Sequence, residues 1–247
     1  MPTTQLQEVS LQGQQVGYTC FLKCAELILA AQGKTFPFPQ ANRIIATETA
    51  GRGDIRAAIL KVWSDTTQAP EATVRRALQA EMALVVPPAK LTGVRAAWAE
   101  KERYWANPGA YQRGSTEAKA ANVTLTEASA GFTQDMFLKA CGFSKVVVEQ
   151  AAFRSGAIEL SGKPTLIMGK LWNAKKAGDE HTTELCGRAI KYFNTSKFSE
   201  TGGHALVLSG VFFDGEAWRY LFRDPNHAGY WKSKQCEKFP DVEVWRA

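Results

Sequence analysis

Cys20-Phe21-Leu22-Lys23-Cys24-Ala25-Glu26-Leu27-Ile28-Leu29-Ala30 is the stretch of the chain that most constrains its fold. Its composition is that of a buried helix, which begins at a thiol and ends near Gly33. The first N–H groups of a helix have no acceptor within it and carry a partial positive charge, which biases a thiol there toward the nucleophilic thiolate. We therefore expect Cys20 to be a nucleophile, with the amide of Gln14 just upstream of it.

A second informative stretch lies near the C-terminus. Gly203-His204 opens an apolar strand, and Asp214-Gly215 is a turn sequence that leads to a second strand ending at Asp224. A hairpin that turns near residue 214 places His204 opposite about 224–226, so that either Asp224 or Asn226 is brought next to the imidazole. We choose Asp224, because the following proline holds it at the rim of the sheet, and a carboxylate there would raise the pKa of the histidine.

The order Cys, His, Asp resembles that of the papain-like cysteine peptidases. The similarity is closest to their compact bacterial branches, the bacteriocin-processing peptidases and the group that contains the AvrRpt2-type effectors. In those branches Gln-x5-Cys precedes a helix, Gly-Gly-His-Ala begins a strand, and Asp-Pro closes the next strand. The corresponding segments of this chain are Gln14-x5-Cys20, Gly203-His204-Ala205 and Asp224-Pro225-Asn226, although Phe21 stands where Trp is usual and Lys23 where a small residue is usual.

The resemblance implies an α+β, papain-like fold in a single catalytic domain over residues 1–247. The nucleophile helix would belong to an N-terminal helical lobe, about 12–131 with an unassigned helical insertion, and would pack on the antiparallel sheet of a strand-rich lobe, about 132–247. The implied function is a cysteine peptidase that cleaves peptide or amide bonds without a cofactor or a metal. Cys20 would attack, His204 would transfer protons, Asp224 would orient the imidazole, and Gln14 would donate to the oxyanion with the backbone N–H of Cys20.

Other interpretations stay open. The same site would suit an amidase, deamidase or acyltransferase acting on peptidoglycan or protein amides, and the fold would also suit a non-enzymatic binding module, against which the intact Cys, His, Asp and Gln argue. Cys24, one helical turn after Cys20, is the rival nucleophile, but its position inside the helix favours core packing. A metal site of Cys20, Cys24 and His204 lacks the usual ligand spacing.

Composition narrows the partners. The net charge is +6, but Lys and Arg are scattered without a dense run, so we do not expect a nucleic acid partner. No apolar stretch reaches the roughly 18 residues of a membrane span, and the N-terminus lacks the pattern of a Sec signal. Five cysteines without a CxxC pair favour free thiols in a reducing compartment.

We thus expect a protein that is cytoplasmic in the producing cell or exported without a Sec signal. The resemblance implies a bacterial effector or toxin that acts on a protein or peptide substrate. It also adds a secretion chaperone, an immunity protein or a host activator as candidate partners.

Local patterns predict the remaining elements. We expect helices over 54–64, 70–84 and about 93–106, followed by a loop over 107–131 and a further helix over 134–141. Strands are expected over 145–148 and 164–169. A polar connection with at most a short hairpin follows over 173–202. His181 is expected on a solvated loop within that connection.

Overall fold

The structure is a computed structural model of the whole chain. It describes residues 2–10, 20–36, 92–93, 95–97, 99–100, 103, 116–129, 134–160, 164–171, 176–195, 203–227, 229–236 and 241–247. Two compact units are present: one combines Met1–Phe36 with Phe143–Ala247, and the other is Pro37–Gly142. The helix that begins at Cys20 therefore shares a unit with the strands. The predicted helices over 54–64 and 70–84 lie outside the described residues, and so does Gln14.

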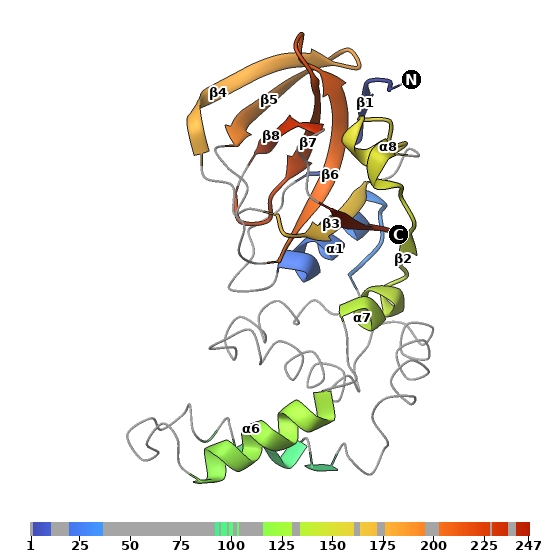
Figure 1. Cartoon of the computed structure of the whole chain (residues 1–247). Coiled ribbons are helices and arrows are strands. Elements are labelled where there is room, and N and C mark those ends of the chain that lie inside the picture. The colour runs from blue at the N-terminus through green and yellow to red at the C-terminus, as the bar shows by residue number, and fades with distance from the viewer. Residues whose placement is uncertain are drawn as a thin grey trace. The chain divides into compact units, whose positions relative to one another are not determined.

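The first unit is built on one large, curved sheet, so the fold is α+β (Figure 1). Its described strands are β1 (Gln5–Leu6), β2 (Ser144–Val146), β3 (Thr165–Gly169), β4 (Lys176–Leu185), β5 (Arg188–Thr195), β6 (His204–Phe213), β7 (Trp218–Arg223), β8 (Tyr230–Gln235) and β9 (Val242–Arg246). They lie in the order β2-β9-β3-β6-β7-β8-β5-β4, with β1 also paired to β6. The β5–β8 pair is parallel, and the other described pairs are antiparallel.

The helix α1 (Cys20–Ala31) packs against β6 and β3 (Figure 1). Its residues from Phe21 to Leu29 are buried apart from Glu26, as expected of a helix covered by its surroundings. The helix ends where predicted, because Gly33 adopts the left-handed conformation (φ 70°). The N–H of Gly33 bonds to the carbonyl of Ala30 and the N–H of Lys34 to that of Leu29, which is the Schellman pattern.

The centre of the sheet is β6, the strand predicted from its apolar sequence. Every residue from His204 to Phe212 is buried, since β3 and β7 flank the strand and α1 lies against it. A bulge at Ser209 interrupts the pairing with β7, and Gly210 follows it. A side chain at position 210 would place its Cβ 3.0 Å from the carbonyl oxygen of Gln5, so glycine allows β1 to approach β6 closely.

Among the described residues, buried hydrophobic side chains on and around the sheet form two clusters. The larger consists of Phe153, Ile158, Leu160, Ile167, Leu171, Leu206, Leu208, Val211, Tyr220, Phe222, Trp231, Cys236, Val242 and Val244. The smaller consists of Leu185, Ile190, Tyr192, Phe212, Leu221 and Tyr230. The helix α8 (Gln150–Arg154) contributes Phe153 to the larger cluster. The strands β6 and β7 supply side chains to both clusters.

The segment 173–202, predicted as a polar connection with at most a short hairpin, contains more regular strand structure than expected. It holds the long hairpin of β4 and β5, turning at Cys186 (φ 51°) and Gly187 (φ 75°), which both adopt the left-handed conformation that a two-residue hairpin turn favours. Few of its described side chains are buried, and the alternation that marks a strand is confined to Ile190 and Tyr192 of β5, which is too short a signal in a polar sequence. His181 is exposed as expected, but it lies on β4 rather than on a loop.

In the second unit, the prediction of a loop over 107–131 is wrong, because Thr116–Ser129 form the helix α6. Several of its described side chains are exposed, which leaves little apolar periodicity to read, although alanine and glutamate favour helix. The predicted short helix is confirmed as α7 (Gln134–Ala140), followed by Gly142 at φ 87°. The described residues between 92 and 103 are helical, in agreement with the prediction for 93–106. No helix among the described residues is long and apolar enough to cross a membrane.

Candidate active site

The structure brings His204 and Asp224 together through the β6–β7 hairpin. Val207 pairs with Arg223, so the first residue of β6 and the residue after β7 lie at the same end of the hairpin. The distance from His204 Nε2 to Asp224 Oδ1 is 3.0 Å. Both residues are buried, with 7% of His204 and 0% of Asp224 exposed. A hydrogen bond in such surroundings is shielded from water, which strengthens it electrostatically.

The thiol of Cys20 completes this contact from the N-terminus of α1. Burial by itself lowers the pKa of His204, but hydrogen bonds to Asp224 and to the Cys20 thiol, with the charges of both groups, raise it to about 9. Since Nε2 is engaged by Asp224, Nδ1 is the ring nitrogen left for the thiol. The imidazole therefore lies between a carboxylate and a thiol, and it favours its protonated form at neutral pH.

The Asp224 carboxylate is held by a local turn. Besides His204 Nε2, its Oδ1 accepts the backbone N–H of Asn226 at 2.9 Å. The backbone carbonyl of Asp224 accepts the N–H of His227 at 3.0 Å. These bonds form an Asx-type turn that fixes the carboxylate toward the histidine. Asn226, the alternative partner of His204 in the sequence, thus supplies a backbone donor to Asp224.

The two cysteines of α1 lie in different surroundings. Cys20 is partly exposed, whereas Cys24 is fully buried. Burial raises the pKa of Cys24 well above its ordinary value, the negative charges of Cys20 and Asp224 add to this, and the charge of Lys23 opposes it. A thiol that is buried and kept protonated is a poor nucleophile, so the geometry favours Cys20 over Cys24.

Lys23 is a residue whose surroundings the sequence did not predict. Only 7% of it is exposed, and its Nζ lies 3.1 Å from Glu26 Oε2, one turn further along α1. The i, i+3 spacing of a basic and an acidic residue was a signal for this ion pair. The pair lets a lysine occupy a position that is otherwise enclosed.

Gln14, the predicted oxyanion donor, lies outside the described residues. His227 packs its ring against Trp231, with a centroid distance of 5.1 Å, and Trp231 belongs to the larger hydrophobic cluster. Among the described residues, no group of three or more His, Cys, Asp or Glu side chains is arranged to hold a metal ion. The five cysteines are free.

Comparisons with protein-family models, with curated proteins and with solved structures found no match to this chain. The arrangement of Cys20, His204 and Asp224 is therefore the feature of this molecule that indicates a function.

Proposed function

We propose that the protein is a papain-like cysteine peptidase, which cleaves peptide or amide bonds through Cys20, His204 and Asp224. The observation that carries the proposal is the hydrogen-bonded series of a buried carboxylate, a buried imidazole and a partly exposed thiol. A thiol hydrolase needs these three groups in this order.

The surroundings of each group support its role. Cys20 is the first residue of α1, where backbone N–H groups have no acceptor within the helix and the helix dipole favours a negative charge. His204 has a raised pKa, so that it can hold a proton beside a thiolate. Asp224 is fixed by its turn and keeps the ring oriented, with Nδ1 directed to the nucleophile.

In the first half of the proposed reaction, the Cys20 thiolate attacks the carbonyl carbon of the substrate. A carbon–sulfur bond forms, and the carbonyl oxygen becomes an oxyanion that Gln14 and the Cys20 backbone N–H stabilise. The intermediate collapses to a thioester as the carbon–nitrogen bond breaks. The imidazolium of His204 gives its proton to the departing nitrogen, which leaves as an amine.

In the second half, neutral His204 takes a proton from water, and the resulting hydroxide attacks the thioester. The carbon–sulfur bond breaks, the product leaves as a carboxylic acid, and the thiolate is restored beside the imidazolium. Asp224 stabilises the positive charge that returns to the ring without taking the proton itself. An acyl acceptor other than water would turn the same site into an acyltransferase.

The test uses p-nitrophenyl acetate, a small activated ester that reports acyl transfer to a thiol without knowledge of the natural substrate. We expect a burst of p-nitrophenolate from the wild type and an acetyl group on Cys20 by mass spectrometry. Cys20→Ala should remove the burst while leaving the protein folded, because the nucleophile is removed and little buried volume is lost.

Cys186→Ser is the matched control, since Cys186 is an exposed thiol outside the site. A burst that survives in Cys20→Ala but disappears in Cys24→Ala would show that the wrong thiol was chosen. No burst from the wild type would contradict the proposed activity. Mass spectrometry of candidate proteins and of peptidoglycan, incubated with wild type and with Cys20→Ala, then separates a peptidase from an amidase or a deamidase.

A further inference from the structure

Cys24 is a buried thiol that the proposed reaction does not use. It is 0% exposed and follows Cys20 by one turn of α1, which places the two side chains next to each other on one face of the helix. Burial raises the pKa of Cys24, and the charges of Cys20 and Asp224 raise it further. The buried thiol therefore lies within electrostatic reach of both the proposed nucleophile and the carboxylate of the site.

The other cysteines do not share this relation to Cys20. Burial also raises the pKa of Cys141 and of Cys236, but without a contribution from the charge of Cys20. Cys141 belongs to the second unit. Cys236 follows the end of β8 that lies beside the turn of the β6–β7 hairpin, and Cys186 lies in the turn between β4 and β5. Cys24 is thus the thiol that α1 itself presents to Cys20.

The spacing within α1 is compatible with a bond between the two sulfurs. Four residues of an α-helix rise by about 6 Å, which lies within the Cα separation of about 4.4–6.8 Å found in disulfides. The Cβ atoms, about 5–6 Å apart in a helix, have to approach to about 3.8 Å. Cys20 is the first residue of α1, so its N–H has no acceptor in the helix. A local movement of Cys20 can therefore close the gap while the rest of the helix keeps its bonds.

The surroundings of Cys20 make it the thiol that reacts first with a peroxide. It is partly exposed and lies beside the imidazolium of His204, which favours the thiolate. The thiolate attacks one oxygen of hydrogen peroxide, and the oxygen–oxygen bond breaks. The sulfur becomes a sulfenic acid, while the departing hydroxide takes the proton of His204 and leaves as water.

This first step also changes the surroundings of Cys24. A negative thiolate is replaced by a neutral sulfenic acid, so one of the charges that oppose ionisation of Cys24 is removed, while the charge of Lys23 continues to favour it. The Cys24 sulfur then attacks the Cys20 sulfur. The sulfur–sulfur bond forms, the sulfur–oxygen bond breaks, and the hydroxyl group leaves as water with the proton of the Cys24 thiol. The two electrons that the thiols lose have reduced the peroxide.

We propose that Cys20 and Cys24 form a reversible disulfide that closes the site in the presence of a peroxide. The regulation rests on the proposed function, because it consists in the loss of the nucleophile. The disulfide itself requires only that Cys20 is reactive and Cys24 adjacent. It also protects Cys20, since a sulfenic acid without a neighbouring thiol is oxidised further to a sulfinic acid, which thiol reductants do not reverse.

Tryptic peptides identify the bond directly. The reduced full chain is treated with hydrogen peroxide, and its free thiols are then alkylated with iodoacetamide after unfolding. Lys23 is the first basic residue of the chain, so trypsin separates Cys20 in peptide 1–23 from Cys24 in peptide 24–34. We expect mass spectrometry to find these two peptides linked, with the loss of two hydrogen atoms, and separate again after dithiothreitol. A non-reducing gel should show that the linked protein is monomeric.

The variant Cys24→Ala removes the second thiol. Dimedone, which labels sulfenic acids, should then label Cys20 for longer than in the wild type, and continued exposure to peroxide should add two oxygen atoms to Cys20. The burst with p-nitrophenyl acetate should be lost under peroxide in both proteins, and dithiothreitol should restore it in the wild type alone. Cys236→Ala is the matched control, because it also removes a buried thiol, and it should behave as the wild type does.

Three results would overturn the disulfide. They are a wild type in which peroxide gives sulfinic acid on Cys20 without linked peptides, a link from Cys20 to another cysteine, and a link found only in a dimer. Failure of the proposed function has a different signature, because the untreated wild type then shows no burst. Linked peptides in such a protein would retain the disulfide and overturn the enzymatic role of the site.

Discussion

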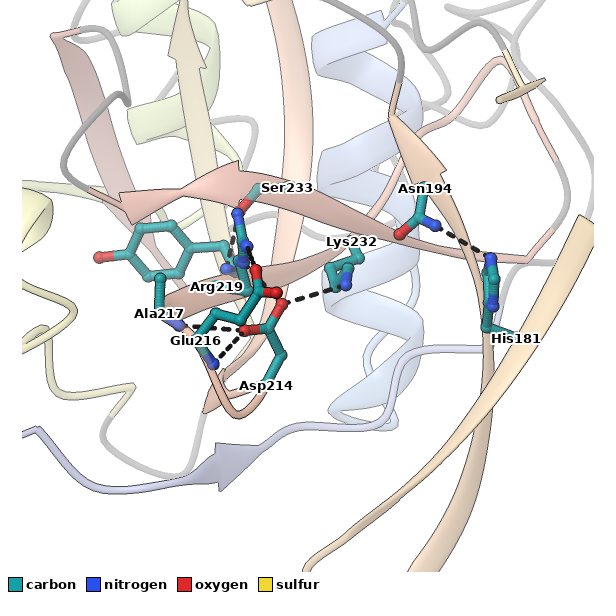
Figure 2. A network of polar contacts seen from close by, with 9 residues as sticks. His181, Asn194, Asp214, Glu216, Ala217, Arg219, Lys232 and Ser233 are labelled. Carbon is teal, nitrogen blue, oxygen red and sulfur yellow. Dashed lines mark hydrogen bonds and ion pairs between the residues drawn. The ribbon is translucent and has the colours of Figure 1, made fainter. Parts of the chain in front are cut away.

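The β6–β7 hairpin carries an aspartate at each end, and the two differ in the kind of basic side chain that each one binds. At the turn, Asp214 Oδ1 accepts the backbone N–H groups of Glu216 and Ala217, while Oδ2 accepts Arg219 Nε at 2.7 Å and Lys232 Nζ at 3.1 Å (Figure 2). At the open end, Asp224 faces the imidazole of His204.

The charged partners of Asp214 are the guanidinium group of Arg219 and the ammonium group of Lys232. Burial raises the pKa of Asp214, but the hydrogen bonds from Ala217, Lys232, Arg219 and Glu216 outweigh it and hold the pKa well below its usual range. This network joins the turn to β8 and fixes the hairpin.

Asp224 is instead paired with a group that can lose its proton. Burial lowers the pKa of His204, but its hydrogen bonds to Asp224 and Cys20 raise it to about 9. The contact is again one between a carboxylate and a cation, but here the cation can give its proton to a neighbouring group. The two ends of the hairpin thus differ in the group that faces the carboxylate: a guanidinium and an ammonium group at Asp214, and an imidazole that can exchange a proton at Asp224.

The largest expected effect is at the titrating end. Asp224→Asn keeps the shape of the side chain but removes the charge that supports the imidazolium, so we expect acylation of Cys20 by p-nitrophenyl acetate at pH 7 to fall by about 100- to 10,000-fold. The measurement is the burst rate as a function of pH. The rate should recover in part at higher pH, where the thiolate forms without help from the imidazolium.

Asn226→Ala is the control for this change. The substitution retains the backbone N–H that bonds to Asp224, so its effect should stay within about 0.5 kcal/mol in the activation free energy, as for an ordinary partly exposed position. A disabled Asn226→Ala beside a nearly normal Asp224→Asn would reverse the assignment of the orienting residue.

An intermediate effect, on stability, is expected at the turn of the hairpin, where Asp214 lies. Asp214→Asn leaves a carbonyl oxygen for the turn but presents an amide to the donors of Arg219 and Lys232, which should lower the free energy of unfolding by roughly 1–3 kcal/mol. Urea unfolding measures this loss. The alkylation rate of Cys20 in the folded variant should equal that of wild type, and a slower rate with no loss of stability would mean that the turn belongs to the active site.

The sequence predicted the parts of this hairpin that have local signals. The apolar run after His204 gave β6, Asp214-Gly215 gave the turn, and a simple count across the turn gave the approach of Asp224 to His204, all of which the structure contains. The helix of Cys20 was equally evident, because its apolar residues are continuous and Gly33 marks its end.

The rest depended on contacts between residues far apart in the chain. The described side chains of the β4–β5 hairpin are mostly exposed, and the apolar alternation of Ile190 and Tyr192 on β5 is too short to have revealed the strands in a polar sequence. The backbone of Val9 is hydrogen-bonded to the side chains of Arg223 and Tyr230, which lie more than two hundred positions later in the chain. Neither Arg223 nor Tyr230 stands in a recognisable motif. The burial of Lys23 likewise follows from packing around α1, which no local pattern encodes.

The smallest expected effect separates the two ends of the hairpin by pH. The pKa of His204 is raised from 6.5 to about 9 in the folded protein, so protonation of His204 stabilises the fold fully below about pH 6.5. This contribution is lost as the pH rises toward 9. The pKa of Asp214 is lowered, so its contribution to stability is present above pH 3.8, the ordinary pKa of this carboxyl group, and is lost as the pH falls through the folded-state pKa.

Cys20→Ala removes one of the interactions that raise the pKa of His204. The histidine should therefore titrate at lower pH, and the alkaline loss of stability should shrink. Asp214→Asn should weaken the loss in acid and leave the alkaline loss intact. Titration of the three histidines by NMR, with urea unfolding from pH 3 to 10, measures both ends together. An unchanged pKa of His204 in Cys20→Ala would mean that the thiol does not face the imidazole, and the proposed nucleophile would lose its base.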